Sequence, residues 1–330
     1  MNSTTDSAPT IEPPRLIPSF AAGFNAVANH IYLILPPVVL DLVLWFGPHL
    51  RLKSLMLPYI LDSIATVNEM STPETRQMLT GIEQIWTAFL EHYNLLSTLN
   101  TFPVGVPSLM ASQAPLLTPL GSPAMVEING LLAAMGLWLL TLVVGLSLGS
   151  LYFAGVAHCS TPQPGASLQP AVLAWQTLQV FVLLIIVFAI FIIMVLPAIF
   201  ITSILSLLNP VLASVALLGM SFIAIWLLIP LVFSPHGIFA FRQNVLKAML
   251  SSTRLVRFFL PGTGMFLLIA IILYQGLGTL WRTPPDSSWM ALVGVVGHAF
   301  ISTGLLAASF IYYRSGHDFV LSLRGQTNSI

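Results

Sequence analysis

The sequence predicts an all-α integral membrane protein, a polytopic bundle of six transmembrane helices. Of its 330 residues, 56% are hydrophobic and only 7% are charged, whereas soluble domains carry about 25% charged residues. Apolar runs that are long enough to cross a hydrocarbon core of about 30 Å recur along the chain. The third observation is a basic, acid-free segment, residues 234–260, between two of these runs. The predicted spans are residues 26–46, 130–153, 173–200, 211–233, 262–280 and 290–312.

The N-terminal residues 1–20 are expected to form a disordered cytoplasmic tail. They lack the charged start, the short apolar core and the small-residue cleavage site of a secretory signal, so we expect the first span to be retained. That span contains Pro36-Pro37, and proline removes a backbone donor and kinks a helix. We therefore predict that the first span is bent or divided at this pair.

A long insert outside the membrane, residues 47–127, is predicted between the first two spans. Within it, Ser71 and Glu74 fit a capping box, and apolar residues come after them at helical spacing. We expect one amphipathic helix near residues 72–98, on the outer side of the membrane. This helix either covers the ends of the spans or docks a protein partner. Its apolar stripe consists of Met78, Ile82, Ile85, Trp86, Phe89, Tyr93 and Leu96.

Small residues in the second and sixth spans are predicted to serve helix packing. Gly145 and Gly149 form a small-x-x-x-small pattern that lets another helix approach closely. Gly294 and Gly297 are assigned to packing in the same way. Residues 21–312 are expected to form one membrane domain that ends in a cytoplasmic tail, residues 313–330.

The basic segment is expected to form one amphipathic helix over residues 236–259, lying on the cytoplasmic membrane surface. Anionic lipid headgroups or a partner would bind its cations. In this orientation seven of the eleven cations lie in the two tails and this segment, in keeping with the positive-inside bias. We therefore predict a multi-pass protein of a prokaryotic cytoplasmic membrane with both termini inside. The lipid-binding or partner-binding candidates are Arg242, Lys247, Arg254 and Arg257.

Three polar residues inside predicted spans are candidates for chemistry. Charges at such depth cost about 2.5–3.5 kcal/mol on insertion scales, which makes Asp41 a functional candidate by default. It has either a structural role beside the proline break or a role in transport or proton transfer. His298 either bonds a neighbouring helix or serves as a ligand or proton relay. Ser147 lies in a G-x-S-x-G pattern within a span, where the pattern lacks the strand-to-helix turn that gives it catalytic meaning.

The sequence lacks the residue patterns of nucleotide-binding and metal-binding sites. No Walker loop or dinucleotide fingerprint occurs, and H-E-x-x-H is missing, with His158-Cys159 an isolated pair. We expect no metal and no cofactor. The formal net charge of zero argues against a nucleic-acid partner, which requires a broad basic surface.

Three segments begin membrane hairpins in a similar way, residues 20–30, 168–179 and 239–259, so a threefold repeat is a hypothesis. The lead-in Asn244-Val-Leu-Lys-Ala-Met-Leu-Ser-Ser-Thr-Arg-Leu-Val-Arg257, which runs towards a glycine and a span, resembles the multispan membrane domain associated with bacterial glycerophosphodiester phosphodiesterases and its stand-alone relatives. The resemblance covers residues 166–312, and this chain has no soluble phosphodiesterase domain. It implies a membrane architecture and, at most, a lipid-facing role.

Two functions from different classes are consistent with these features. The first is a non-enzymatic scaffold or accessory subunit of a membrane assembly, with a partner on the 72–98 helix. The second is a small transporter or lipid-handling protein that uses Asp41 and His298 around a midplane site; an intramembrane serine hydrolase is a remote third. A transporter predicts that both residues face a polar cavity, whereas a scaffold predicts a packed interior and an exposed apolar patch on the outer helix.

Overall fold

The computed structural model describes residues 13–69, 73–112, 114–162 and 169–327. The protein is an all-α helix bundle, as predicted, with one short two-stranded sheet. It divides into two compact units. Unit 1 comprises Met1–His30, Phe153–Ile271 and Gly304–Ile330, and unit 2 comprises Ile31–Tyr152 and Ile272–Thr303. Three helices contribute residues to both units: α5 (Leu131–Ser160), α10 (Leu260–Trp281) and α11 (Ala291–Thr327).

Within the described residues, five helices are long and apolar enough to cross a membrane. A sixth span is counted only when the bent pair Leu16–Asn29 and Ile31–Phe46 is taken together. These helices are those of a multi-pass membrane protein. The five are Leu131–Ser160, Pro170–Leu208, Pro210–Phe241, Leu260–Trp281 and Ala291–Leu323.

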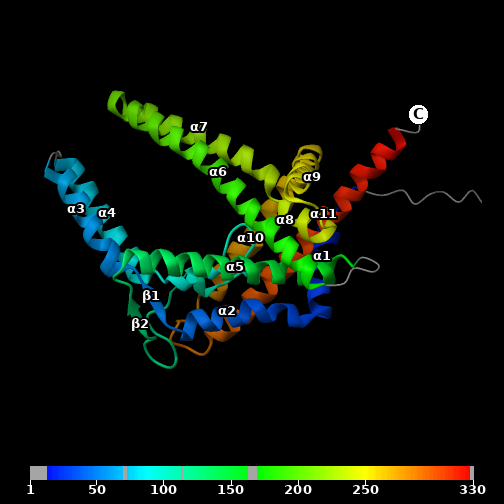
Figure 1. Cartoon of the computed structure of the whole chain (residues 1–330), viewed down its shortest axis with the longest axis horizontal. Helices are drawn as coiled ribbons and strands as arrows, with labels where there is room; N and C mark the ends of the chain where they lie inside the picture. The colour runs from blue at the N-terminus through cyan, green and yellow to red at the C-terminus, as the bar shows by residue number, and fades with distance from the viewer. Residues whose placement is uncertain (1–12, 70–72, 113, 163–168, 328–330) are drawn as a thin grey trace, which may run out of the picture. The chain divides into compact units, whose positions relative to one another are not determined.

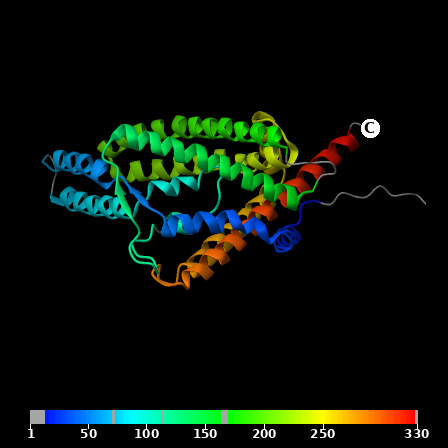
Figure 2. The same cartoon turned by 60° about the horizontal axis from the view of Figure 1, so that its bottom comes forward.

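Unit 2 holds the insert that comes after the first span. Strands β1 (His49–Arg51) and β2 (Met125–Glu127) pair in parallel, with Leu50 opposite Val126, and close the two ends of the insert. Helices α3 (Lys53–Glu69) and α4 (Pro73–His92) pack against each other as a hairpin (Figures 1 and 2). The other elements of the unit are η1 (Ile31–Ile34), α2 (Leu35–Phe46), η2 (Leu95–Leu99) and η3 (Met110–Ser112).

Unit 1 contains a second hairpin, formed by α6 (Pro170–Leu208) and α7 (Pro210–Leu228) (Figure 1). Asn209 separates the two helices, and its side chain accepts a hydrogen bond from the backbone N–H of Val211 at 2.8 Å. The remaining elements are α1 (Leu16–Asn29), η4 (Ile229–Leu231), α8 (Ser234–Phe241) and α9 (Val245–Phe258).

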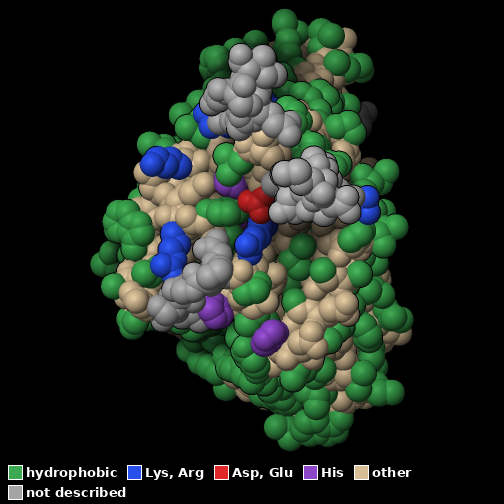
Figure 3. Space-filling view, turned by 90° about the vertical axis from the view of Figure 1, so that its right-hand side faces the viewer, with side chains coloured by type: hydrophobic (Ala, Val, Ile, Leu, Met, Phe, Trp, Pro, Cys, Tyr) green, Lys and Arg blue, Asp and Glu red, His purple; other side chains and the backbone are tan. Residues whose placement is uncertain are grey.

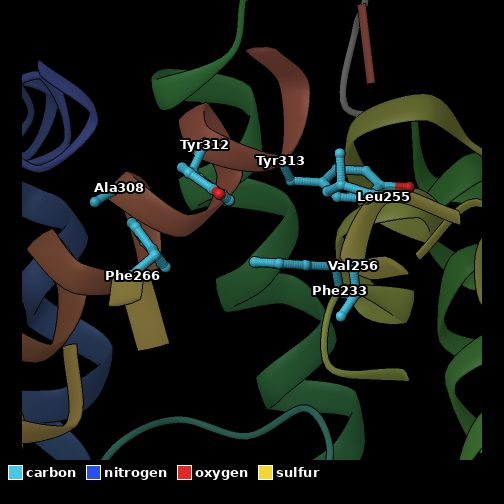
Figure 4. Packing of buried hydrophobic residues seen from close by; sticks show 7 residues of the cluster. All are labelled: Phe233, Leu255, Val256, Phe266, Ala308, Tyr312 and Tyr313. Atoms are coloured by element: carbon cyan, nitrogen blue, oxygen red, sulfur yellow. The ribbon is translucent and has the colours of Figure 1, made fainter. Parts of the chain in front are cut away.

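The apolar core of unit 1 is a cluster of aromatic and aliphatic side chains (Figure 4). Phe266 stacks on Tyr312 with ring centroids 4.5 Å apart, and Phe233 contacts Tyr313 at 5.6 Å. Burial of such rings is the largest apolar contribution that a side chain makes to a core. The cluster joins α9, α10 and α11, and its members are Phe233, Leu255, Val256, Phe266, Ala308, Tyr312 and Tyr313.

The first span breaks at a different place from the one predicted. Helix α1 ends at Asn29, and His30 leaves helical geometry with φ −131° and ψ 57°. Pro36 and Pro37 instead occupy the first positions of α2, where the missing N–H of proline has no helical partner to lose. The prolines therefore start a helix here rather than divide one.

The terminal segments also differ from the prediction. The described part of the N-terminal segment is helical from Leu16 onwards, where a disordered tail over 1–20 was expected. Helix α11 continues through the predicted tail to Thr327. Tyr313 belongs to the unit 1 core, so packing extends this helix beyond the apolar run.

The insert over residues 47–127 is more helical than predicted. Helix α4 corresponds to the predicted helix near 72–98 but ends at His92, and η2 comes after it as a separate element. Helix α3 was not predicted; Pro58 lies inside it, and a proline in a helix interior removes a backbone hydrogen bond. The Ser71 of the proposed capping box lies outside the described residues.

The predicted basic helix over 236–259 is two helices. Arg242 ends α8 in the left-handed region, with φ 52° and ψ 32°, a conformation that is uncommon for residues other than glycine. Asn244 then starts α9 by accepting a hydrogen bond from the N–H of Lys247 at 3.0 Å. Helix α8 is buried along most of its length and contains no permanently charged side chain. It belongs to the fourth apolar span, Pro210–Phe241.

Candidate functional site

Asp41 binds the proline-rich part of the insert between the first two spans. Its carboxylate accepts hydrogen bonds from the Ser108 hydroxyl at 2.5 Å and from the N–H groups of Leu109 and Met110 at 3.1 and 2.9 Å. Ser108 in turn accepts from the N–H of Ala111 at 2.9 Å. The carboxylate and the serine thus cap the first turn of η3.

This arrangement explains how a carboxylate can be fully buried, with 0% of its surface exposed. An unpaired buried charge is costly, and several hydrogen bonds to the charged form offset much of that cost. The donors come from residues 67 to 69 positions away in the sequence. Asp41 therefore fastens the 108–112 turn to α2.

His298 lies in unit 2 with 2% of its surface exposed. Its ring faces Tyr274 at a centroid distance of 5.2 Å, and Arg282 is close enough to interact electrostatically with the imidazole. The Nε2 atom of His298 and the Nε atom of Arg282 have no hydrogen-bond partner within the described part of the chain. The guanidinium of Arg282 also donates to Ser112 at 2.9 Å.

Asp41 and His298 therefore belong to one polar region of unit 2. The turn that Asp41 caps ends at Ser112. Ser112 accepts a hydrogen bond from Arg282, which interacts electrostatically with His298. The two intramembrane candidates were proposed separately from the sequence. Arg282 and Ser112, which connect them, were not identified as part of any site.

Ser147 is bonded within its own helix. Its hydroxyl donates to the carbonyl of Val143, one turn earlier in α5, at 2.8 Å. Such back-bonding is the usual state of a serine in an apolar helix. No hydrogen bond within the described residues joins Ser147 to His298, so the geometry gives a serine hydrolase no support.

The four glycines lie close to other segments of the chain, two of them to the insert and two to Trp281 at the end of α10. A Cβ on Gly145 would lie 2.7 Å from the carbonyl oxygen of Leu99, and one on Gly149 would lie 2.7 Å from the Cα of Gly105. The irregular segment of the insert thus lies against α5. Gly294 and Gly297 make room for Trp281, whose carbonyl oxygen and indole ring approach them.

Comparison with protein-family models, with curated proteins and with solved structures finds no match. The resemblance to the phosphodiesterase-associated membrane domain therefore stays a prediction. The contacts, burial and charge of this chain are then the basis for assigning it a function.

Two buried glutamines hold the basic segment of unit 1. Gln176 donates through Nε2 to the carbonyl of Ile238 at 3.0 Å, and the side-chain oxygen of Gln179 accepts from the N–H of Val245 at 2.8 Å. The amides thus satisfy backbone groups at the end of α8 and the start of α9. The sequence could have indicated these two glutamines, because they are a polar pair in an apolar helix and a spacing of three residues places them on the same face.

Helix α9 presents its cations outwards. Lys247, Arg254 and Arg257 are exposed, whereas Val245 and Val256 are buried. Figure 3 shows Lys and Arg side chains on one side of the molecule, with His side chains and an acidic side chain among them. Arg242, the fourth cation of the candidate set, lies in the connection between α8 and α9.

A cavity of about 530 Å³ opens beside α9 within unit 1. Its walls come from α6, α7, η4, α9 and the start of α10. Most of the lining is apolar, and the polar exceptions are Thr253 and Arg257. Cavities of about 300–1,000 Å³ with few polar groups are the usual form of a small-molecule site.

Helix α4 leaves its apolar stripe uncovered. Ile85 is 69% exposed and Phe89 is 52% exposed, although Phe89 contacts the rings of Trp86 and Tyr93 at 5.8 and 5.5 Å. Burial raises the pKa of the Tyr93 hydroxyl, since that residue lies at the base of the hairpin. The outer part of the stripe therefore presents aromatic and aliphatic surface on a hairpin outside the predicted spans.

Proposed function

We propose that this chain is a non-enzymatic membrane protein that acts as a scaffold or accessory subunit of a membrane assembly. The exposed apolar stripe of α4 is the observation that carries the proposal. Ile85, Trp86 and Phe89 form a contiguous aromatic and aliphatic surface on a helical hairpin. Exposed apolar patches on a polar element are typical of protein interaction sites.

Charge indicates the kind of partner. Residues 53–92 contain five acids and two cations, and one of the cations, Lys53, is paired with Glu91 at 3.3 Å. Glu83, on α4, has no ion pair within the described residues. The complementary partner is an amphipathic helix of another protein with an apolar stripe flanked by Lys or Arg, since such a helix satisfies both features of the hairpin.

We further propose a prokaryotic cytoplasmic membrane, with both termini and α9 inside and the α3–α4 hairpin outside. The positive-inside bias supports this orientation, because α9 carries three cations and no acid. The prokaryotic assignment is supported only by the resemblance to bacterial membrane domains.

Site-specific crosslinking from α4 tests the scaffold proposal. A photoreactive residue at Ile85 is expected to give a discrete heavier product in intact membranes, identified by mass spectrometry as a protein with a basic amphipathic helix. The same residue at Gln84, an exposed position beside Ile85, is the matched control and is expected to give little product. Crosslinking only to lipid, or equal yields at both positions, would show that the stripe docks no protein.

A transporter is the second candidate, and one observation favours it. The Nε2 atom of His298 is buried without a hydrogen-bond partner in the described residues, beside the charged Arg282. Buried unpaired polar atoms mark sites that gain a ligand or a proton. Proton flux into vesicles containing the protein, lost in His298→Ala and retained in Ser147→Ala, would establish this function in place of the first.

A further inference from the structure

The cavity beside α9 lies at the junction of an apolar hairpin and a basic helix. Trp226 and Ile229 line it from the α7 and η4 side, and Ile190 lines it from α6. Met249, Thr253 and Arg257 line it from α9, at spacings of four residues. One row of α9 side chains therefore runs along the cavity, and that row ends in a cation.

The apolar walls fit a hydrocarbon chain. The α6–α7 hairpin exposes large hydrophobic side chains along its length, including Trp226 at 59% and Leu227 at 50%, so its environment is lipid. A cavity that opens from such a surface is accessible to acyl chains without passage through water. Transfer of apolar surface between lipid and this cavity is nearly neutral, so affinity has to come from the polar end.

The polar end selects a negative charge. Arg257 is exposed and has no ion pair or hydrogen bond within the described residues. No acid occurs between Glu127 and Asp286, so none of the elements that line the cavity supplies a carboxylate to compete with a ligand. An Arg guanidinium binds a phosphate oxygen pair in a bidentate manner, and the Thr253 hydroxyl adds a donor one turn away.

We propose that this cavity is a binding site for an anionic phospholipid, with an acyl chain between α6, α7 and α9 and the headgroup phosphate on Arg257 and Thr253. This site is separate from the partner-docking stripe of α4 and goes beyond the scaffold role. Arg254 gives a matched comparison, because it is an exposed cation on the same helix that does not line this cavity.

Lipid retention by the purified full-length protein tests the site. The protein is exchanged into mild detergent with equal amounts of phosphatidylglycerol and phosphatidylcholine, and native mass spectrometry counts the lipids that stay bound. We expect the native protein to retain one phosphatidylglycerol in preference to phosphatidylcholine. Arg257→Gln is expected to reduce that preference about tenfold, a loss of about 1.4 kcal/mol, whereas Arg254→Gln leaves it unchanged.

A second variant separates the cavity from surface charge. Thr253→Phe keeps Arg257 but fills the cavity, and we expect it to abolish retention of both lipids while inorganic phosphate added as a competitor has no effect on the native protein. Equal losses in Arg257→Gln and Arg254→Gln would overturn the proposal in favour of diffuse attraction by the basic helix. Unchanged retention in Thr253→Phe, or displacement of the lipid by inorganic phosphate alone, would also overturn it.

Discussion

Helices α4 and α9 share a sequence pattern and differ in what covers their apolar faces. Each is a polar helix with an apolar stripe at helical spacing. In α9 the stripe is buried within unit 1, with Ala248 and Val256 at 0% exposure, whereas in α4 Ile85 remains 69% exposed. The difference lies in the neighbours, because η4, α6 and α8 pack on α9, while α4 has mainly α3 beside it.

The comparison shows that amphipathicity specifies a face but not its partner. The α9 stripe completes a core within the chain, together with Phe233 and Tyr313 (Figure 4). The α4 stripe stays exposed, and in our proposal it binds a partner outside the chain. Two helices that look alike in sequence thus serve stability in one unit and, in our proposal, assembly in the other.

The largest expected effect comes from placing a carboxylate in the apolar stripe of α9, compared with one in the stripe of α4. Val256→Asp buries an unpaired charge in the unit 1 core, and we expect it to lower the free energy of unfolding by about 4 kcal/mol. Ile85→Asp changes an exposed position, and we expect an effect within about 0.5 kcal/mol. Denaturant unfolding of the purified proteins in detergent measures both. Comparable losses would mean that the α4 stripe is covered within the chain.

A smaller effect is expected from the glutamine that holds the start of α9. Gln179→Leu removes the acceptor of the Val245 N–H and leaves a buried donor unpaired, which costs about 1–3 kcal/mol. Gln84→Leu on α4 removes an amide from an exposed position and is expected to have no effect. Thermal unfolding in detergent distinguishes the two, and an unchanged melting temperature in Gln179→Leu would show that this bond is dispensable.

The N-cap of α9 is expected to contribute less. Asn244→Ala removes the side chain that accepts from the Lys247 N–H, and such a loss costs about 1 kcal/mol. Asn244→Asp keeps the acceptor and is the conservative control. Hydrogen exchange at the amides of the first turn of α9 reports the change directly. Equal protection in all three proteins would show that tertiary contacts alone fix this helix start.

The smallest expected effect concerns pH at the base of the α3–α4 hairpin. Burial lowers the pKa of His49 below its ordinary value, and its Nε2 lies 3.2 Å from the carbonyl oxygen of Leu44. In the unfolded chain the pKa of His49 is about 6.5. As the pH falls, His49 therefore binds a proton in the unfolded chain before it does so in the folded chain. The stabilisation from neutral, buried His49 is complete above the pKa of the unfolded chain. It is lost as the pH falls from that value through the lower pKa of the folded chain.

Replacement of His49 isolates this contribution. The difference in melting temperature between the native protein and His49→Gln is expected to shrink or reverse between pH 7.5 and pH 5.5, since only the native protein is destabilised by acid at this position. Helix α9 contains no histidine and no acid. A constant difference across the range would contradict the assigned burial of His49.

Much of the fold can be predicted from local pattern. The apolar runs locate α5, α6, α7, α10 and α11, since helix length and hydropathy are local quantities. The polar and apolar faces of α9 are set by residue spacing in the same way. The break at His30 and the division at Arg242 were missed, because both depend on how neighbouring segments pack rather than on a strong local breaker.

The sequence by itself determined that this is an all-α membrane protein and which face of each amphipathic helix is apolar, because both depend on residues a few positions apart. Only the tertiary structure decided that Asp41 caps the 108–112 turn, that Gln179 accepts a hydrogen bond from the first residue of α9 and that Arg282 links Ser112 to His298. The three hydrogen bonds among these contacts join residues 66 to 170 positions apart. Their partners depend on the path of the whole chain, which no local pattern encodes.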